Sequence, residues 1–284
     1  MLNMQSKITI CINGKLIDFT KPKVMGILNV TPDSFYKESR TFDKDTIAKR
    51  ADQIIEEGGD IIDIGAYSSR PGADEVSTQE EIDRLCRALD IIKSKFPDAI
   101  LSIDTFRSSV AKHCITQYGH AIINDISGGE MDSNMFQTIS ELKVPYILMH
   151  MQGTPQTMQI NPQYTNVTQN VLSYFAKKIA MLHQLNVSDI IIDPGFGFGK
   201  TLENNYQLMK DLNKFTFIDV PLLVGISRKS MIYKALDTDP QHALNGTTVL
   251  NTYALSQGAN ILRVHDVREA AEAVRIMQKI TGTF

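Results

Sequence analysis

Eight short apolar runs divide the chain at regular intervals, and nearly every one ends in a polar residue. The runs are rich in Ile and Val and do not alternate with polar positions, which is typical of parallel strands that are buried on both faces. They cover residues 24–28, 61–62, 100–103, 121–123, 145–149, 190–192, 221–226 and 261–264. The pattern therefore predicts eight buried strands.

The segments between these runs have helical periodicity. In the clearest one, apolar residues fall three and four positions apart, and Ser77 with Glu80 and Glu81 favours a helix N-terminus. We expect helices at residues 46–58, 77–96, 107–118, 133–142, 166–185, 202–213, 246–257 and 267–280.

Eight strand–helix units predict an α/β protein with a closed (β/α)8 barrel, and a doubly wound open sheet is the structural alternative. Residues 7–19 alternate around Asn13-Gly14, a dipeptide that favours a tight hairpin turn. We expect this β-hairpin to cover the bottom of the barrel. Because no linker is evident, residues 1–284 are predicted to form a single domain.

Charge and cysteine content exclude several classes of protein. The chain has 29 Lys and Arg against 32 Asp and Glu, a net charge of −3, which argues against a dedicated nucleic-acid binder. Its three cysteines form no CxxC pair. No run reaches the roughly 18 apolar residues of a membrane helix, and the start does not resemble a signal peptide. We expect a soluble cytoplasmic protein with neither nucleic acid nor membrane as a partner.

Active sites of (β/α)8 barrels lie at the C-terminal ends of the strands, where the polar residues that end the runs would form a ring. The alternative for Asp63 and for His150 is that a polar residue after a strand only caps the following helix. The ring is too poor in His and Cys to favour zinc, whereas Mg²⁺ bound by oxygens fits it. It contains Asn29, Asp63, Asp104, Asn124, His150, Asp193, Ser227 and His265.

Two further patterns extend the candidate site. Arg263 and His265 are two positions apart and face the same side of a strand, so with Ser69 and Arg70 they suggest an anion-binding rim. The alternative is that Arg263 pairs structurally with Asp104 or Asp193. The glycine-rich run at 193–200 fits neither a P-loop nor GxGxxG, so we interpret Phe198 as one wall of a pocket for a flat ligand. Met149 either lines this pocket or fills the core.

Seven motifs together resemble the dihydropteroate synthase family, whose order they follow over nearly the whole chain. They are GILNVTPDSF at 26–35, SSRPG at 68–72, SIDT at 102–105, NDISG at 124–128, DPGFGFGK at 193–200, SRKS at 227–230 and RVHDV at 263–267. The resemblance implies a transferase of folate biosynthesis that uses Mg²⁺ and is a homodimer. Its reaction joins 6-hydroxymethyl-7,8-dihydropterin diphosphate to 4-aminobenzoate, giving 7,8-dihydropteroate and pyrophosphate.

The matching motifs also imply roles for individual residues. Asn29 corresponds to the Mg²⁺ ligand. The residues implied to contact the diphosphate are Ser69, Arg70, Arg263 and His265, with Ser227 nearby. Those implied at the pterin are Asp104, Asn124, Asp193 and Lys229, with Met149 and Phe198 as further lining. Those implied at the aminobenzoate are Thr31, Pro32 and Phe35. The resemblance assigns the chemistry itself to Asp104, Lys229, Arg263 and His265.

The residue chemistry agrees with this reaction. A pterin edge presents two adjacent N–H donors, which one carboxylate such as Asp193 can accept together. The ring contains no Ser–His or Cys–His pair for covalent catalysis, and we hypothesise a dissociative displacement. The chain departs from the family pattern at Ala66-Tyr67, Tyr36 and Tyr233. The competing hypotheses are a pterin-dependent methyltransferase with a corrinoid partner and a non-catalytic pterin-binding protein.

Overall fold

Eight parallel strands form a barrel in the computed structural model, which describes residues 8–31, 44–67, 76–158, 160 and 162–282. The strands pair in the order β8-β7-β6-β5-β4-β3-β10-β9, and a parallel bridge between Ile192 and Leu222 joins the two ends of this series. The strands are β3 (Lys23–Asn29), β4 (Ile61–Gly65), β5 (Ile100–Asp104), β6 (Ile122–Asp125), β7 (Tyr146–Met149), β8 (Ile190–Asp193), β9 (Leu223–Val224) and β10 (Ile261–Val264). The prediction of a (β/α)8 barrel is confirmed, and the open sheet is excluded.

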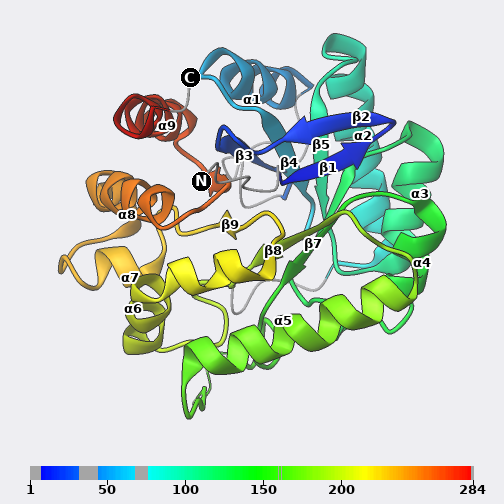
Figure 1. Cartoon of the computed structure of the whole chain (residues 1–284). Helices are drawn as coiled ribbons and strands as arrows, with labels where there is room; N and C mark the ends of the chain where they lie inside the picture. The colour runs from blue at the N-terminus through cyan, green and yellow to red at the C-terminus, as the bar shows by residue number, and fades with distance from the viewer. Residues whose placement is uncertain (1–7, 32–43, 68–75, 159, 161, 283–284) are drawn as a thin grey trace.

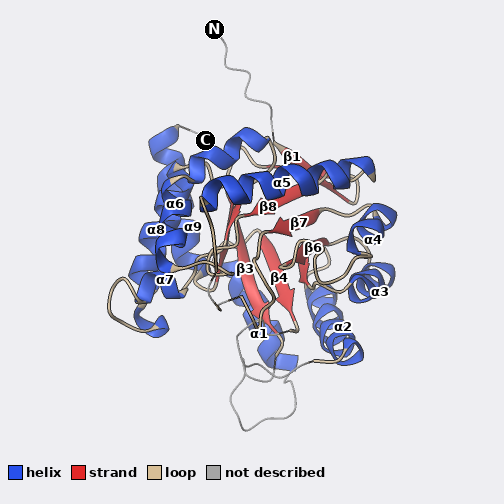
Figure 2. Cartoon of the chain, turned by 90° about the horizontal axis from the view of Figure 1, so that it is seen from below, coloured by secondary structure: helices blue, strands red, loops and turns tan. Residues whose placement is uncertain are grey.

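Helices surround this barrel (Figure 1), and a view turned by 90° places α2, α3 and α4 on one side and α6, α8 and α9 on the other (Figure 2). None of the helices in the described part of the chain combines the length and the apolar character needed to cross a membrane. The helices are α1 (Lys44–Glu56), α2 (Thr78–Lys95), α3 (Ser108–Tyr118), α4 (Met135–Leu142), α5 (Val167–Gln184), α6 (Leu202–Lys210), α7 (Ser230–Tyr233), α8 (Leu244–Ser256) and α9 (Val267–Thr281).

The helices differ from the sequence prediction mainly in the last third of the chain. The helix predicted at 202–213 ends at Lys210 and is followed by a separate 3₁₀ helix, Leu212–Ile218. The prediction was too long because the apolar residues continue past the end of the α-helix. The short helix α7 follows β9 and was not predicted, since four residues are too few to show a periodic pattern. A second 3₁₀ helix, Pro240–His242, precedes α8.

The main core lies between the strands and the helices. Leu85 of α2, Ala111 of α3 and Phe175 of α5 are fully buried in this layer. Gly26 allows α1 to approach β3 closely, because a Cβ atom at this position would lie 2.6 Å from Cγ2 of Ile54. The barrel therefore rests on a continuous apolar shell that holds the strand ends in place.

An N-terminal hairpin closes the bottom of the barrel, as predicted. Its strands are β1 (Thr9–Ile12) and β2 (Lys15–Asp18), joined through Asn13 and Gly14 with φ of 51° and 74°. Ile10 and Phe19 pack against the first residues of the barrel strands, including Met25, Ile61, Ile122, Ile191 and Ile261. The bottom is thus filled by apolar side chains, and the polar strand ends lie at the other face.

Candidate active site

Parallel pairing brings the polar ends of the strands into one layer. Asn29 pairs with Gly65, Gly65 with Asp104, and Asp104 with Asn124, while Met149 pairs with Asp193. These residues come from six neighbouring strands, β3 to β8, and lie at the same C-terminal end of the barrel. The ring predicted from the sequence therefore exists at this face.

Arg263 lies between two carboxylates at the centre of the ring. Its Nε donates to Oδ2 of Asp63 at 2.7 Å, and its Nη2 contacts Oδ2 of Asp63 at 2.6 Å and Oδ2 of Asp104 at 2.7 Å. Burial alone would lower the pKa of Arg263, but the two carboxylates raise it above its ordinary value. The pairing with Asp104 that the sequence left open is observed, and Asp63 is a second partner.

Asp63 is fully buried and organises two other polar side chains of the site. Besides Arg263, it accepts long hydrogen bonds from Nδ2 of Asn124, at 3.3 and 3.4 Å to its two oxygens. The amide orientation of Asn124 follows from this contact. Asp63 therefore fixes one cation and one amide of the ring, which is more than capping a helix.

The carboxyl group of Asp104 is poised to titrate near neutral pH. Burial raises its pKa to about 7, the neighbouring Arg263 opposes this rise, and the negative charge of Asp63 adds to it. Asp104 is one-fifth exposed at its side chain, so a ligand can reach it. Its charge is thus sensitive to whatever binds beside it.

Asp193 and Arg263 both lie close to Gly225. A Cβ atom on Gly225 would be 3.8 Å from Oδ2 of Asp193 and 3.8 Å from Cβ of Arg263. Asp193 is 5% exposed, and its Oδ1 accepts a hydrogen bond from the Gly195 amide at 2.8 Å. Burial raises the pKa of Asp193, while the charge of Lys229 opposes that shift. The carboxylate predicted for the pterin and the arginine predicted for the anion are therefore neighbours.

Lys229 lies beside Phe198 in the same part of the site. Its Nζ donates to the Phe196 carbonyl at 2.6 Å and lies 4.6 Å from the centroid of the Phe198 ring. Burial lowers the pKa of Lys229 to about 8, with the Asp193 carboxylate opposing the shift. This arrangement places a cation and an aromatic face next to a buried carboxylate, which suits a flat polar heterocycle.

His265 and Ser227 form the rim beside Arg263. The Ser227 hydroxyl is 3.2 Å from both the backbone nitrogen and Nδ1 of His265, and Arg50 of α1 donates to the His265 carbonyl at 2.7 Å. Desolvation and then the charge of Arg263 lower the pKa of the His265 ring. The ring is neutral at pH 7 and can donate one N–H to an anion.

The side-chain oxygen of Asn29 lies near a carboxylate oxygen of Asp104. A Cβ atom on Gly65 would lie 3.3 Å from Oδ1 of Asn29 and 3.6 Å from Oδ2 of Asp104, so two oxygens flank this glycine. No set of three or more His, Cys, Asp or Glu side chains in the described ranges could hold a metal by itself. Mg²⁺ commonly uses one or two protein oxygens together with water and phosphate, so the residues present fit that ion.

An apolar cluster lies against the polar ring. Met149, 3% exposed, packs there with Phe106, Ile126, Met151 and Met158, and Phe198 and Tyr67 contact the cluster. Tyr67 meets Phe106 edge-on at 5.0 Å, with the guanidinium of Arg107 5.4 Å from the Tyr67 ring centroid. The Tyr67 ring, at this departure from the family pattern, therefore packs against the loop that follows β5.

Several predicted site residues lie outside the described part of the chain. These are Pro32, Phe35, Ser69 and Arg70, together with the departure at Tyr36. Thr31, the last residue before this gap, is buried at 7% exposure. Tyr233 at the end of α7 packs against the main core.

Sequence reasoning missed the contribution of two residues. Asp63 appeared in the ring but was left out of the predicted site, although it holds Arg263 and Asn124. Lys200 appeared only as the end of a glycine-rich run, yet it is a buried cation next to His150. A charged residue that directly follows such a run is a signal that a partner must be near.

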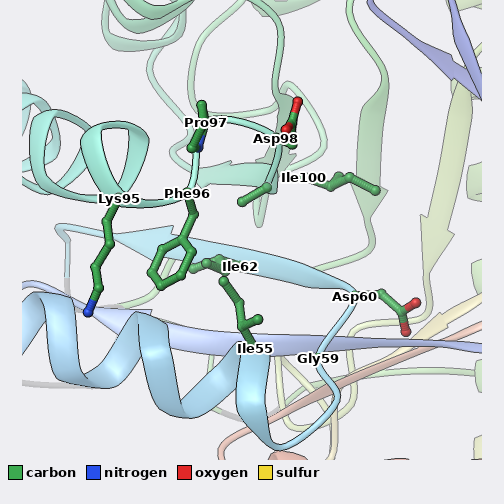
Figure 3. A pocket seen from close by; sticks show the side chains of 10 residues that line it. Ile55, Gly59, Asp60, Ile62, Lys95, Phe96, Pro97, Asp98 and Ile100 are labelled. Carbon is green, nitrogen blue, oxygen red and sulfur yellow. The ribbon is translucent and has the colours of Figure 1, made fainter.

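A separate hollow of about 430 Å³ lies at the opposite end of the barrel (Figure 3). Its lining residues lie at the ends of α1 and α2, in the loops that follow them, and at the first residues of β4 and β5. They include Ile55, Gly59, Ile62, Phe96 and Ile100. Residues at this end of a (β/α)8 barrel serve stability, and the titratable ring is at the other end. We therefore assign the site by its chemistry, at the C-terminal mouth.

The chain is similar in sequence and in structure to known proteins. A family model described as a pterin binding enzyme matches residues 25–265. The dihydropteroate synthase of Haemophilus influenzae is 40% identical over 268 residues, covering 94% of this chain and 96% of the relative. A Yersinia pestis dihydropteroate synthase with a sulfonamide drug complex superimposes with a TM-score of 0.90 at 37% identity, covering 97% and 100% of the two chains. One from Xanthomonas albilineans with 4-aminobenzoic acid gives 0.90 at 30% identity, covering 98% and 100%.

Proposed function

The chain belongs to the pterin-binding enzymes as a member of the dihydropteroate synthase family, and from this premise we propose how its mouth residues carry out the family's reaction. The enzyme is a transferase that joins 6-hydroxymethyl-7,8-dihydropterin diphosphate to 4-aminobenzoate, with pyrophosphate as the second product. Near-complete coverage by synthase relatives decides against the methyltransferase and the non-catalytic alternatives.

The observation that carries the assignment of roles is the closeness of Asp193 and Arg263 across Gly225. A carboxylate that can grip a heterocycle lies beside a cation that can stabilise a leaving anion. The substrate has these two parts joined by one methylene group, so a productive site needs both groups within a few ångströms.

Three side chains hold the pterin in this proposal. The Asp193 carboxylate accepts from the ring N–H and the exocyclic amine, and Lys229 donates to the carbonyl oxygen and a ring nitrogen. Asn124, oriented by Asp63, adds an amide that both donates and accepts. Met149 and Phe198 supply apolar walls. An unpaired edge here would cost about 1–3 kcal/mol per group, which favours a pterin over a plain aromatic ring.

The diphosphate lies at the Arg263 and His265 rim. The C–O bond to the diphosphate breaks with its electron pair leaving on oxygen, so donors at this rim stabilise the transition state. Ser227 holds the His265 ring in place. Ser69 and Arg70, from outside the described residues, complete this contact in the proposal. In the described part of the chain, the hydrogen bonds that Arg263 donates to Asp63 and Asp104 come only from its Nε and Nη2. The other N–H groups of Arg263 can therefore still donate to the diphosphate.

Asn29 would hold a Mg²⁺ ion, which when bound supplies positive charge to the departing pyrophosphate oxygens. Asp104 is close enough to this position for its charge to matter. The ionised form of Asp104 stabilises the positive charge that spreads from the exocyclic carbon into the pterin. The chain's own contribution is therefore to bring opposite charges to the two sides of the bond that breaks.

The second half of the reaction needs little from the protein. The amine of 4-aminobenzoate is neutral near pH 7, so its nitrogen lone pair forms the new C–N bond and its proton leaves to water or phosphate. Thr31, Pro32 and Phe35 contact the aminobenzoate in the proposal. The absence of a paired nucleophile and base around the described ring favours a dissociative displacement with no covalent enzyme intermediate.

The direct test is an assay of the purified chain with both substrates. Pyrophosphate release should require both 4-aminobenzoate and Mg²⁺, with one dihydropteroate formed for each pyrophosphate. Release that is equally fast without 4-aminobenzoate would indicate a hydrolase and would overturn the proposal.

The assembly and the compartment are further proposals. Apolar side chains are exposed on α8 and α9, including Val249 at 58% and Ile276 at 60%, and these two helices pack side by side. We propose that a second copy of the chain covers this face, giving a homodimer of single-domain 1–284 chains. Sedimentation of Ile276→Glu should show a shift to monomer, whereas an unchanged mass would exclude this face.

The free cysteines Cys11, Cys86 and Cys114 support a reducing, cytoplasmic location.

A further inference from the structure

Lys200 is a buried cation that the proposed reaction does not use. It is 3% exposed, and its Nζ donates to the carbonyl oxygens of Gly195 at 2.8 Å, Phe198 at 3.0 Å and His150 at 3.3 Å. Nδ1 of His150 lies 3.1 Å away as a fourth acceptor. A lysine amine is costly to bury without acceptors, so this set of oxygens accounts for its presence.

The acceptors of Lys200 belong to two loops of the candidate site. Gly195 and Phe198 lie in the loop between β8 and α6, and His150 directly follows β7. The two loops touch at their backbones, since a Cβ atom on Gly195 would lie 1.9 Å from the His150 oxygen. Gly195, with φ of 71°, supplies the turn that this approach requires. The Lys200 amine is thus surrounded by main-chain carbonyl groups, and its hydrogen bonds connect the two loops.

The same loop carries two of the proposed pterin contacts, Asp193 and Phe198, and touches a third, Lys229. It begins at Asp193, whose carboxylate accepts from the Gly195 amide. Its Phe196 carbonyl accepts from Lys229, and its Phe198 ring lies beside that lysine. A change in the path of this loop would therefore move a carboxylate, a cation and an aromatic wall at once.

The protonation states of Lys200 and His150 are compatible with these contacts. Burial and the charge of Lys200 lower the pKa of His150 to about 2, so the His150 ring is neutral and can accept. Burial lowers the pKa of Lys200 to about 7 against the opposing pull of Asp193. Both forms of the amine carry at least two N–H donors for the surrounding carbonyls.

We propose that Lys200 is a positioning residue, an internal clamp that shapes the β8–α6 loop so that Asp193, Phe198 and Lys229 converge on the pterin. This inference rests on the proposed function for the identity of the ligand. Lys200 makes no contact with substrate in this account, and it acts through the main-chain oxygens that it ties together.

The test compares Lys200→Met with Tyr164→Phe as a matched control. Methionine keeps the length and the apolar stem of the lysine but loses its donors. The Tyr164 hydroxyl donates to the Gly199 carbonyl at 2.7 Å, so the control removes a hydrogen bond from the same loop at its outer side. The readouts are the affinity for 6-hydroxymethylpterin by calorimetry, the KM for 4-aminobenzoate at saturating pterin diphosphate, and the melting temperature.

Lys200→Met should weaken pterin binding about tenfold or more, because small displacements of positioned groups have effects of this size. The KM for 4-aminobenzoate should stay close to that of the parent, and Tyr164→Phe should bind pterin normally. Lower melting temperature with unchanged pterin affinity would make Lys200 merely structural and overturn the inference. A parent chain that binds no pterin would instead refute the proposed function.

A second variant covers the case in which Lys200→Met does not fold. Among the contacts of Lys200, His150→Ala removes only the one to Nδ1 and keeps the three carbonyl acceptors. It also removes the packing of the His150 ring on Tyr174, at 4.9 Å between ring centroids. A weakened pterin affinity in this folded variant, with the KM for 4-aminobenzoate retained, supports the clamp. Parent-like affinity would count against it.

Discussion

Asp63→Asn removes one negative charge from the centre of the ring and keeps the size of the side chain. In the parent, the Oδ2 atoms of Asp63 and Asp104 contact the same nitrogen of Arg263, at 2.6 and 2.7 Å. The two oxygens are therefore no more than about 5 Å apart. At an effective dielectric constant of about 20, two unit charges at about 5 Å repel by about 3 kcal/mol, or roughly two pKa units.

The variant should shift the pKa of Asp104 downward from about 7. Part of the repulsion is screened by the guanidinium between the two carboxylates, so we expect a fall of about one to two units. Because the ionised form of Asp104 is the active one in this account, the acid limb of kcat/KM should move to lower pH by the same amount.

Asp63→Asn should also lower the stability of the fold and the maximal value of kcat/KM. Removing one partner of a buried ion pair costs about 3–5 kcal/mol, but Arg263 keeps Asp104 and the new amide oxygen can still accept. We expect a loss of about 2–3 kcal/mol in the free energy of unfolding by urea. The maximum of kcat/KM should fall as well, because Arg263 and Asn124 lose a shared anchor.

The control for this prediction is Asp60→Asn, three residues earlier in the chain. Asp60 pairs with Lys23 at 3.0 Å at the bottom of the barrel, with 32% of its side chain exposed. Its variant should leave the pH profile where it is. A folded Asp63→Asn enzyme with an unmoved acid limb would refute the coupling between Asp63 and Asp104.

Three other changes test separate parts of the site. Arg263→Ala should lower kcat by about a hundredfold or more in the coupled pyrophosphate assay, the scale for losing one anion-stabilising donor, and near-normal turnover would remove Arg263 from the rim. Asn29→Ala should raise the Mg²⁺ concentration needed for half-maximal rate, whereas an unaltered metal titration would exclude Asn29 as a ligand. Burial lowers the pKa of Lys229 to about 8, and only its protonated form donates fully, so pterin affinity should decline as pH rises through about 8. Affinity that stays flat to pH 9 would argue against that contact.

The barrel could be predicted because its signal is local. Runs such as residues 190–192 are apolar on both faces, and they became β8 (Ile190–Asp193) with a boundary one residue away. The run at 221–226 gave only a two-residue strand, Leu223–Val224, since its ends bridge and turn toward neighbouring strands. Strand identity depended on hydrophobicity, whereas strand length depended on pairing partners that the sequence does not show.

The ring could also be predicted, but its internal pairing could not. Parallel strands oblige Asp104 and Asp193 to share one face, so their placement follows from the fold. Which carboxylate meets Arg263 depends on side-chain directions across β4, β5 and β10, and Asp63 was therefore undervalued. Lys200 was missed for a related reason, because its acceptors are main-chain oxygens of a curled loop.

Titration calorimetry of Asp193→Asn with two separate ligands, 6-hydroxymethylpterin and pyrophosphate with Mg²⁺, tests most directly whether a pterin pocket and an anion rim lie side by side at this mouth. The account predicts that pterin affinity falls about tenfold or more through the lost carboxylate, while pyrophosphate still binds to Arg263 and His265. Unchanged pterin affinity in the folded variant would contradict it, because the heterocycle would then be held elsewhere.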